Sequence, residues 1–274
     1  MKNMRSSKEQ SLDIKIIDAL KALNVSGKVL DGTRLILEDE EIQVIQEYAN
    51  TVSIVRLGYN DHGPVHMRTV ALNAIIMMGF LRQAGIKTSL ESEGVGNFED
   101  SLIGVIYAAM LHDLGMSIGR QDHELHSAYQ AIPILERLLG LVYKNDLKKI
   151  VMVRSLVLEG ISGHMGNRAV YSLEAGLVQV ADGCDMTKGR ARIPMALGNM
   201  PTSGNIHKFS ANSINKVSLT QGQEKPINIK ITMSSEVGIF QIEEVLMSKI
   251  AVSTAKPYIE LYAQVNNDEP KRYL

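Results

Sequence analysis

The stretch FEDSLIGVIYAAMLHDLG, residues 98–115, holds the longest apolar run of the chain and ends in a histidine, an aspartate, a leucine and a glycine. Its apolar positions predict a strongly apolar helix over 98–114 that lies at the centre of the fold. A charge at the end of such a helix needs a partner, because an unpaired buried carboxylate is costly. We therefore expect His112 and Asp113 either to be paired or to bind a metal ion.

The chain on both sides of this stretch predicts further helices up to about residue 200. Pro64 can open a helix over 66–83, since proline is tolerated in a first turn. Residues 32–58 predict a long helix that starts in the acidic turn 38–41, where negative charge suits the helix dipole, and ends at Gly58. The remaining helices are expected over 11–23, 123–139, 146–160 and 172–186. These segments predict a helical domain over 1–205.

The pattern changes near residue 205. Residues 214–235, INKVSLTQGQEKPINIKITMSS, predict two strands around a polar turn, and the second alternates apolar and polar positions as a half-buried strand does. A helix over 238–250 and a strand over 257–265 are expected to follow. This ββαβ order predicts a small α+β domain over 206–274, with residues 196–210, rich in Gly, Pro, Asn and Ser, as the linker.

Composition and charge restrict the class of protein. The 274 residues are 45% hydrophobic and 22% charged, which is ordinary for a globular chain with a substantial core. A net charge of −1 gives no general attraction to nucleic acid or to anionic membrane. The longest apolar run, 102–111, is too short to span a bilayer, and the N-terminus does not resemble a signal peptide. The single cysteine, Cys184, excludes an intrachain disulfide. We expect a cytoplasmic protein.

Candidate metal ligands are spread over the helical domain. His66 lies on the helix opened by Pro64, and Asp182 lies among apolar positions of a later helix, where its charge also needs a partner. A single histidine on an apolar helix is usually a satisfied core residue. Imidazole nitrogen and carboxylate oxygen together suit borderline divalent ions, so these residues with His112 and Asp113 are also candidates for one metal site.

The order of these residues resembles the HD-domain superfamily of metal-dependent phosphohydrolases over roughly residues 45–195. The pattern is a histidine in GPVHMRTVA (63–71), a His-Asp pair in AAMLHDLGMS (108–117) and an aspartate in VQVADGCDMTKGRAR (178–192). The whole chain also resembles an uncharacterised, largely archaeal group with an HD domain and a C-terminal α+β segment. The stretches that carry this second resemblance are YNDHGPVH (59–66), DMTKGRARIP (185–194) and GIFQIEEVL (238–246).

The resemblance implies that His66, His112, Asp113 and Asp182 bind a divalent ion. Some members add histidines between the His-Asp pair and the last aspartate, and there the pair's aspartate bridges two ions. His123 and His164 lie in that interval, and we prefer His123 to His126 because it stands first after the loop. The ion is expected to be Mn, Fe, Co, Ni, Zn or Mg.

The function implied is hydrolysis of a phosphate mono- or diester, for example a nucleotide, by a metal-activated water. Asp113 would bridge the ions or orient the nucleophile. His62 is either a proton donor to the leaving group or a hydrogen-bonded turn histidine. Near the end of the motif, Lys188, Arg190 and Arg192 either receive the phosphate or form a solvated helix end, and Arg120 is a weaker phosphate candidate.

Two other functions remain open at this point. The protein could bind a nucleotide or metal without turnover, with the α+β domain serving in regulation or assembly. It could also be a di-iron oxygenase, since some HD proteins oxidise their substrates. The expected partners are a phosphorylated small molecule and a second copy of the chain in a homodimer.

Overall fold

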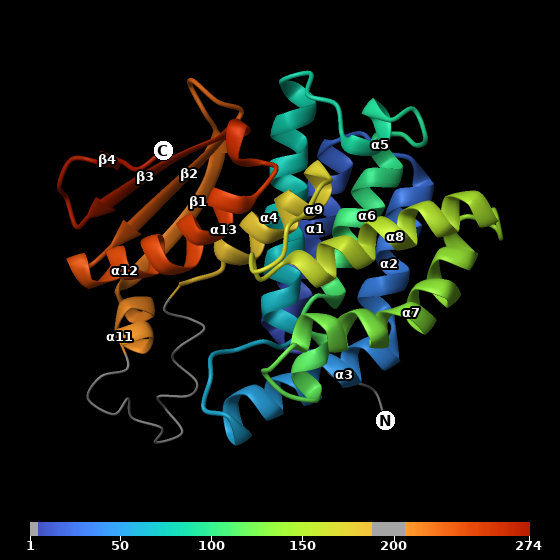
Figure 1. Ribbon diagram of the computed structural model, residues 1–274, viewed down its shortest axis with the longest axis horizontal. Coiled ribbons are helices and arrows are strands. Elements are labelled where there is room, and N and C mark those ends of the chain that lie inside the picture. The colour runs from blue at the N-terminus through green and yellow to red at the C-terminus, as the bar shows by residue number, and fades with distance from the viewer. Residues whose placement is uncertain (1–4, 188–205) are drawn as a thin grey trace.

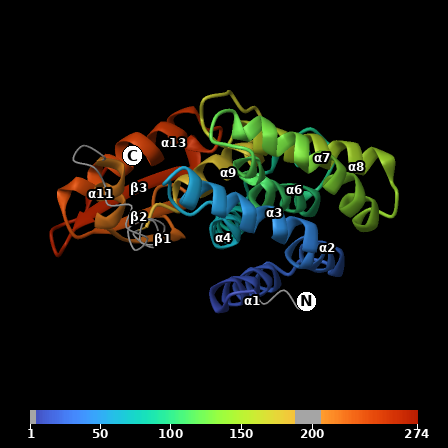
Figure 2. The ribbon, with the colours of Figure 1, turned by 90° about the horizontal axis from the view of Figure 1, so that it is seen from below.

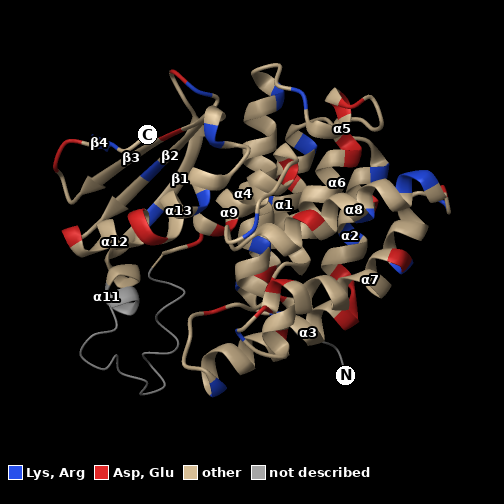
Figure 3. Ribbon diagram, in the orientation of Figure 1, with Lys and Arg blue, Asp and Glu red and all other residues tan. Residues whose placement is uncertain are grey.

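The structure, a computed structural model, describes residues 5–187 and 206–274. It is mostly helical, with a small sheet near the C-terminus, and the two parts lie side by side (Figure 1). The predicted layout of a helical part followed by a small α+β part is therefore confirmed. Basic and acidic residues are interspersed over both parts (Figure 3), in keeping with the near-zero net charge. Lys188, Arg190, Arg192 and most of the expected linker lie outside the described residues.

The central element is α6 (Phe98–Leu111), as predicted. It packs against α2, α4, α8 and α9, and each of its side chains from Ser101 to Leu111 is buried. The side chain of Asn97 accepts a hydrogen bond from the backbone N–H of Asp100, whose carboxylate in turn accepts from the backbone N–H of Asn97, so the helix begins with a capping box. The elements around α6 are α1 (Ser7–Ala22), α2 (Gly27–Glu38), α3 (Glu40–Thr51), η1 (Val52–Arg56), α4 (Pro64–Gln83), α5 (Ser89–Ser92), η2 (Leu114–Ser117), α7 (His123–Val142), α8 (Leu147–Gly163) and α9 (Leu173–Gly183).

The long helix predicted over 32–58 is wrong in one respect. Residues up to Glu38 belong to a separate helix, α2, because Asp39 leaves helical geometry with a ψ of 121°. Its carboxylate accepts a hydrogen bond from the backbone N–H of Ile42 and so caps α3. The predicted acidic start of the later helix is confirmed, as is the opening of α4 by Pro64.

The C-terminal part begins with a helix that the sequence did not predict, α11 (Ile206–Ser213), which overlaps the end of the expected linker. The four strands lie in the order β1-β2-β3-β4, with β2 parallel to β3 and the other two pairs antiparallel. Helical turns connect β2 to β3, so the expected ββαβ order is present, and β4 is an addition. The elements are β1 (Ile214–Gln221), β2 (Ile227–Met233), η3 (Glu236–Gly238), α12 (Ile239–Gln241), η4 (Ile242–Met247), α13 (Ser248–Val252), η5 (Lys256–Tyr258), β3 (Ile259–Val265) and β4 (Lys271–Arg272).

Two glycines of α9 allow the C-terminal part to approach closely. A Cβ on Gly176 would lie 2.1 Å from Thr254 Oγ1, and one on Gly183 would lie 3.0 Å from Leu246 Cδ1. The Ser253 hydroxyl also donates a hydrogen bond of 2.8 Å to the carbonyl oxygen of Gly176. Figure 1 and Figure 2 both show α13 beside α9 as a result. This contact brings α13 next to the end of α9, where Asp182 lies.

Among the described residues, one helix has the length and composition of a membrane span. It is α4, and 67% of its most apolar window is buried inside the fold, as in the core helix of a folded domain. Its buried Arg68 donates hydrogen bonds to Asp13 on α1 and to Gln43 and Gln46 on α3. These bonds connect α4 to the N-terminal helices.

Candidate metal centre

Six predicted ligands come together where the ends of five helices meet. His66 lies in the first turn of α4, His112 and Asp113 directly follow α6, and His123 is the first residue of α7. His164 directly follows α8, and Asp182 lies in the last turn of α9. All six side chains are buried. The set that the resemblance implied is therefore gathered in one place, with His123 rather than His126 in the cluster.

Gly115 makes the close approach of α7 possible. A Cβ at this position would lie 2.1 Å from the carbonyl oxygen of His123 and 2.6 Å from the backbone nitrogen of Ser127. The backbone N–H of Gly115 instead donates a hydrogen bond of 2.8 Å to the Ser127 hydroxyl. The glycine that follows the His-Asp pair thus lets His123 reach the cluster.

Four ligand atoms surround a first position. The Nε2 of His66 lies 3.2 Å from the Nε2 of His112, 3.2 Å from Asp182 Oδ1 and 3.3 Å from Asp113 Oδ2. The Nε2 of His112 lies 3.4 Å from the same Asp113 oxygen and 3.8 Å from Asp182 Oδ1. Two imidazole nitrogens and two carboxylate oxygens therefore face a common centre.

Three ligand atoms surround a second position beside the first. The Nε2 of His123 lies 3.2 Å from both Asp113 Oδ1 and the Nε2 of His164, and His164 Nε2 lies 3.5 Å from that same oxygen. The two oxygens of Asp113 thus belong to different positions. Asp113 would therefore be a ligand in both positions if each held an ion.

The histidine tautomers show that the Nε2 atoms that face one another carry lone pairs. The Nδ1 atoms of His112, His123 and His164 lie 2.7–3.0 Å from backbone carbonyl oxygens, which can only accept hydrogen bonds. Each Nδ1 therefore carries the proton, and each Nε2 presents a lone pair. Two lone pairs 3.2 Å apart repel unless a cation lies between them. Ligands about 2.0–2.1 Å from a shared divalent ion lie about 2.8–3.4 Å apart in octahedral or tetrahedral geometry. The separations of 3.2–3.4 Å fit such an ion, whereas His112 Nε2 and Asp182 Oδ1, 3.8 Å apart, would have to move closer to share it.

Burial and neighbouring groups keep the ligands in their binding forms. Burial would raise the pKa of the Asp113 carboxyl, but His112, His123 and His164 hold that pKa well below its usual range. Burial also lowers the pKa of His164 to about 4. Near neutral pH, Asp113 is therefore a carboxylate and His164 a neutral imidazole, as metal ligands must be.

Two further side chains contact the ligands, and the sequence analysis missed both. Asp185 Oδ2 accepts a hydrogen bond of 2.7 Å from the Nδ1–H of His66, which orients this ring toward the first position. The Lys249 ammonium on α13 donates to Asp182 Oδ2. Burial would raise the pKa of Asp182, but Lys249, together with His66 and His112, holds it well below its usual range. Asp185 follows Asp182 by three residues, which is a signal that was available, whereas nothing in the local sequence singles out Lys249.

The cluster lies at the wall of a pocket of about 560 Å³ between the two parts of the chain. Asp113, His164 and Asp182 line it from the helical part, together with Arg120 and His62. The lining from the C-terminal part is Ala211, Gln241, Glu244, Val245, Ser248 and Lys249. A small molecule in this pocket would therefore contact both the ligands and the α+β part.

His62 shows features of both roles that the sequence left open. Its Nδ1 lies 2.7 Å from the carbonyl oxygen of Asn60 and 2.9 Å from the Ser53 hydroxyl, as expected of a turn histidine. The residue also lines the pocket, and its ring centre lies 5.9 Å from that of His66.

Comparison with known proteins gives one informative similarity. The chain is 42% identical over 235 residues to the uncharacterized protein MJ1020 of Methanocaldococcus jannaschii, and the similarity covers 86% of this chain and 88% of that protein. No family model and no solved structure matches the chain.

Proposed function

The chain belongs to the family of the Methanocaldococcus jannaschii protein MJ1020, and we propose that it is a metal-dependent phosphohydrolase of the HD-domain type. The observation that carries this proposal is the pair of adjacent ligand positions that share Asp113. The His66, His112 and Asp182 ligand atoms supply one position, and those of His123 and His164 supply the other. A pair of ions bridged by a carboxylate suits displacement at phosphorus, where the attacking and leaving oxygens both need stabilisation.

The bound ions would supply an acidified water and polarise the phosphoryl oxygen. The residues of the chain position the ligand atoms. Asp113 sets the spacing between the two positions, because each of its oxygens faces one of them. Asp185 keeps the proton of His66 on Nδ1, and Lys249 leaves Asp182 with one oxygen directed to the first position. The ligand atoms are therefore held in place before substrate arrives.

His62 is the candidate proton donor to the leaving oxygen. Its Nδ1–H is directed to the Asn60 carbonyl oxygen, which only accepts. In the protonated ring, Nε2 carries the second proton, and the ring lines the pocket. Transfer of that proton to the departing oxygen would assist leaving groups that are poor as anions.

The test begins with the metal content of protein purified without added metal. Elemental analysis is expected to find Mn, Fe, Co, Ni, Zn or Mg, because imidazole and carboxylate ligands admit this range. The loaded protein is expected to hydrolyse 4-nitrophenyl phosphate, and His112→Ala or Asp113→Asn is expected to abolish the activity. His126→Ala is a matched control, since this half-buried histidine lies on α7 but outside the cluster. Activity that survives both ligand substitutions would refute the proposal.

Two results would point to the other functions. Oxygen uptake by iron-loaded protein, without phosphoester hydrolysis, would indicate the oxygenase. Tight binding of nucleotides by loaded protein with no turnover of any phosphoester would indicate a regulatory binding protein.

A further inference from the structure

Among the residues that the structure describes, the pocket contains an arginine without a carboxylate partner. Arg120 lines the wall next to the second metal position. Its Nη1 lies 3.4 Å from the Nε2 of His123, and its Nη2 lies 3.9 Å from the sulfur of Met165. Within residues 5–187 and 206–274, no acidic side chain forms an ion pair with it. A guanidinium stays charged at all physiological pH values, and an imidazole and a thioether are poor partners for that charge.

Metal binding would leave Arg120 with still fewer acceptors. The lone pair of His123 Nε2 is the one that faces the second position. A lone pair that held an ion would no longer accept a hydrogen bond from Arg120. The guanidinium would then lie beside a divalent cation, and an anion in the pocket would balance both charges. A phosphoryl group offers the paired oxygens that a guanidinium binds best.

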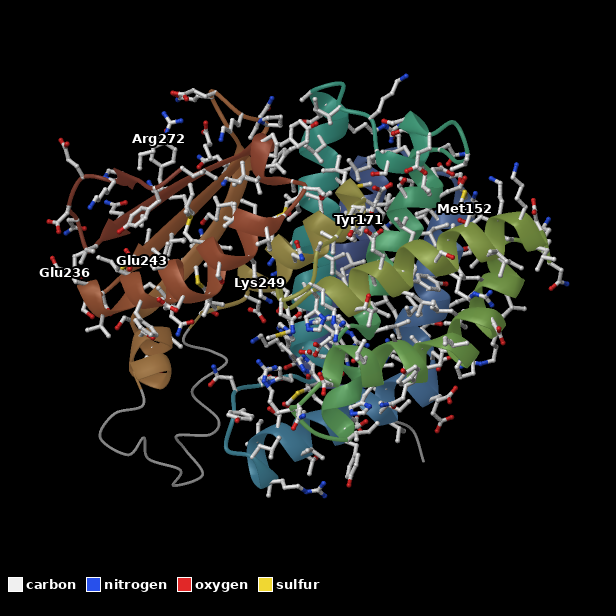
Figure 4. The ribbon with its side chains drawn as sticks, viewed as in Figure 1. Met152, Tyr171, Glu236, Glu243, Lys249 and Arg272 are labelled. Carbon is white, nitrogen blue, oxygen red and sulfur yellow. The ribbon has the colours of Figure 1, made fainter. Side chains whose placement is uncertain are left out.

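A second cation lies beside the first metal position. Lys249 belongs to the C-terminal part, and Figure 4 shows it at the junction with the helical part, whereas Glu236 and Arg272 lie far from that junction. Its ammonium donates to Asp182 Oδ2, and the residue also lines the pocket. An ammonium has three N–H donors, so Lys249 can retain Asp182 and still donate to a ligand.

We propose that Arg120 and Lys249 form a clamp for the phosphoryl group of the substrate, with one cation beside each metal position. This proposal rests on the proposed function and narrows its substrate class. Two added cations favour the dianion of a phosphate monoester over the single charge of a diester. The α+β part is then a wall of the binding site, because it supplies one of the two cations.

Binding of inorganic phosphate to the full-length, metal-loaded protein tests the clamp without relying on turnover. Calorimetry is expected to show that Arg120→Gln and Lys249→Gln each weaken phosphate binding about tenfold to a hundredfold, the loss typical of a charge-assisted hydrogen bond. Arg120→Lys and Lys249→Arg should retain part of the affinity. Arg154→Gln and Lys256→Gln are matched controls. Arg154 pairs with Glu136 and Lys256 is exposed, and neither lines the pocket.

Metal content is measured for every variant, so that loss of an ion is not mistaken for loss of phosphate binding. Arg120 touches neither aspartate ligand, so its variants stay informative even if Lys249→Gln disturbs Asp182. Hydrolysis of 4-nitrophenyl phosphate and of bis(4-nitrophenyl) phosphate is compared in parallel. The ratio of kcat/KM values is expected to favour the monoester and to fall in Arg120→Gln.

The outcomes separate the clamp from the proposed function. Phosphate binding that is equal in wild type, Arg120→Gln and Lys249→Gln, or absent from loaded wild type, overturns the clamp even if hydrolysis is observed. Phosphate binding that depends on Arg120, in a protein that hydrolyses no phosphoester, supports the clamp and refutes the hydrolase.

Discussion

Replacing Gly115 with alanine is expected to disable the second metal position and to leave the first in place. The added Cβ would lie 2.1 Å from the carbonyl oxygen of His123 and 2.6 Å from the backbone nitrogen of Ser127. Both atoms belong to the backbone of α7, so no side-chain rotation can relieve the clash. The start of α7 must move, and His123 moves with it.

The size of the effect follows from these distances. Ordinary contact begins near 3.4 Å, so the first separation must grow from 2.1 Å by about 1.3 Å. A displacement of about 1 Å at a catalytic group can reduce the rate about a hundredfold. Overpacking of this kind costs about 1–3 kcal/mol of unfolding free energy. In a chain of this size each kcal/mol lowers Tm by about 2–4 °C.

Three measurements check this expectation on Gly115→Ala: metal content per chain, kcat/KM for 4-nitrophenyl phosphate, and Tm of the metal-free protein. Gly119→Ala is the matched control, since it lies in the same connection and a Cβ there would meet nothing within 4 Å. We expect the control to match wild type. If Gly115→Ala keeps both ions and full activity, the stated role of the α7 approach is wrong.

Three other substitutions or conditions address single residues. His123→Ala should lower the metal content by one ion, whereas His126→Ala should not, and equal ion content in both variants would contradict the second position. The metal-free protein should lose unfolding free energy as pH falls from about 6.5 to about 4, because the unfolded chain protonates His164 near 6.5 and the folded chain only near 4. Above about pH 6.5 the stabilisation from neutral His164 is fully present. The dependence of Tm on pH should therefore be flatter in His164→Gln, and an equally steep dependence would contradict this role. His62→Gln should slow hydrolysis of alkyl phosphates about a hundredfold and spare 4-nitrophenyl phosphate, whose leaving group needs little protonation; equal losses on both would argue for a structural role.

Much of the cluster of candidate ligands was predictable from the sequence, because its residues lie at helix ends that hydrophobic patterns locate. The run before His112 predicts a buried helix, and the structure buries it completely. Pro64 fixes the start of α4 and therefore the place of His66. The resemblance to the HD-domain superfamily then predicted that the residues at these helix ends lie together in one site.

The features that the sequence did not predict depend on contacts between segments far apart in the chain. Lys249 meets Asp182 because α13 packs on the glycines of α9, and no local pattern at residue 249 records that packing. Likewise, the hydrophobic periodicity predicted one helix where the structure has α2 and α3, because the break at Asp39 is one residue long and both helices keep apolar faces. Arg120 was a minor candidate in the sequence. The structure places it beside His123, and no acidic side chain in the described part of the chain pairs with it.

The sharing of Asp113 also bears on how the protein would respond to metal supply. A single negative charge serves both positions, so an ion in the first leaves less of that charge for the second and repels the next ion. The first position has two carboxylate ligands and the second only the shared one. Loading would then be sequential and negatively cooperative, with the second ion more readily lost. Activity would follow the free metal concentration in a graded way, which would make the occupancy of the second position a sensor of metal availability.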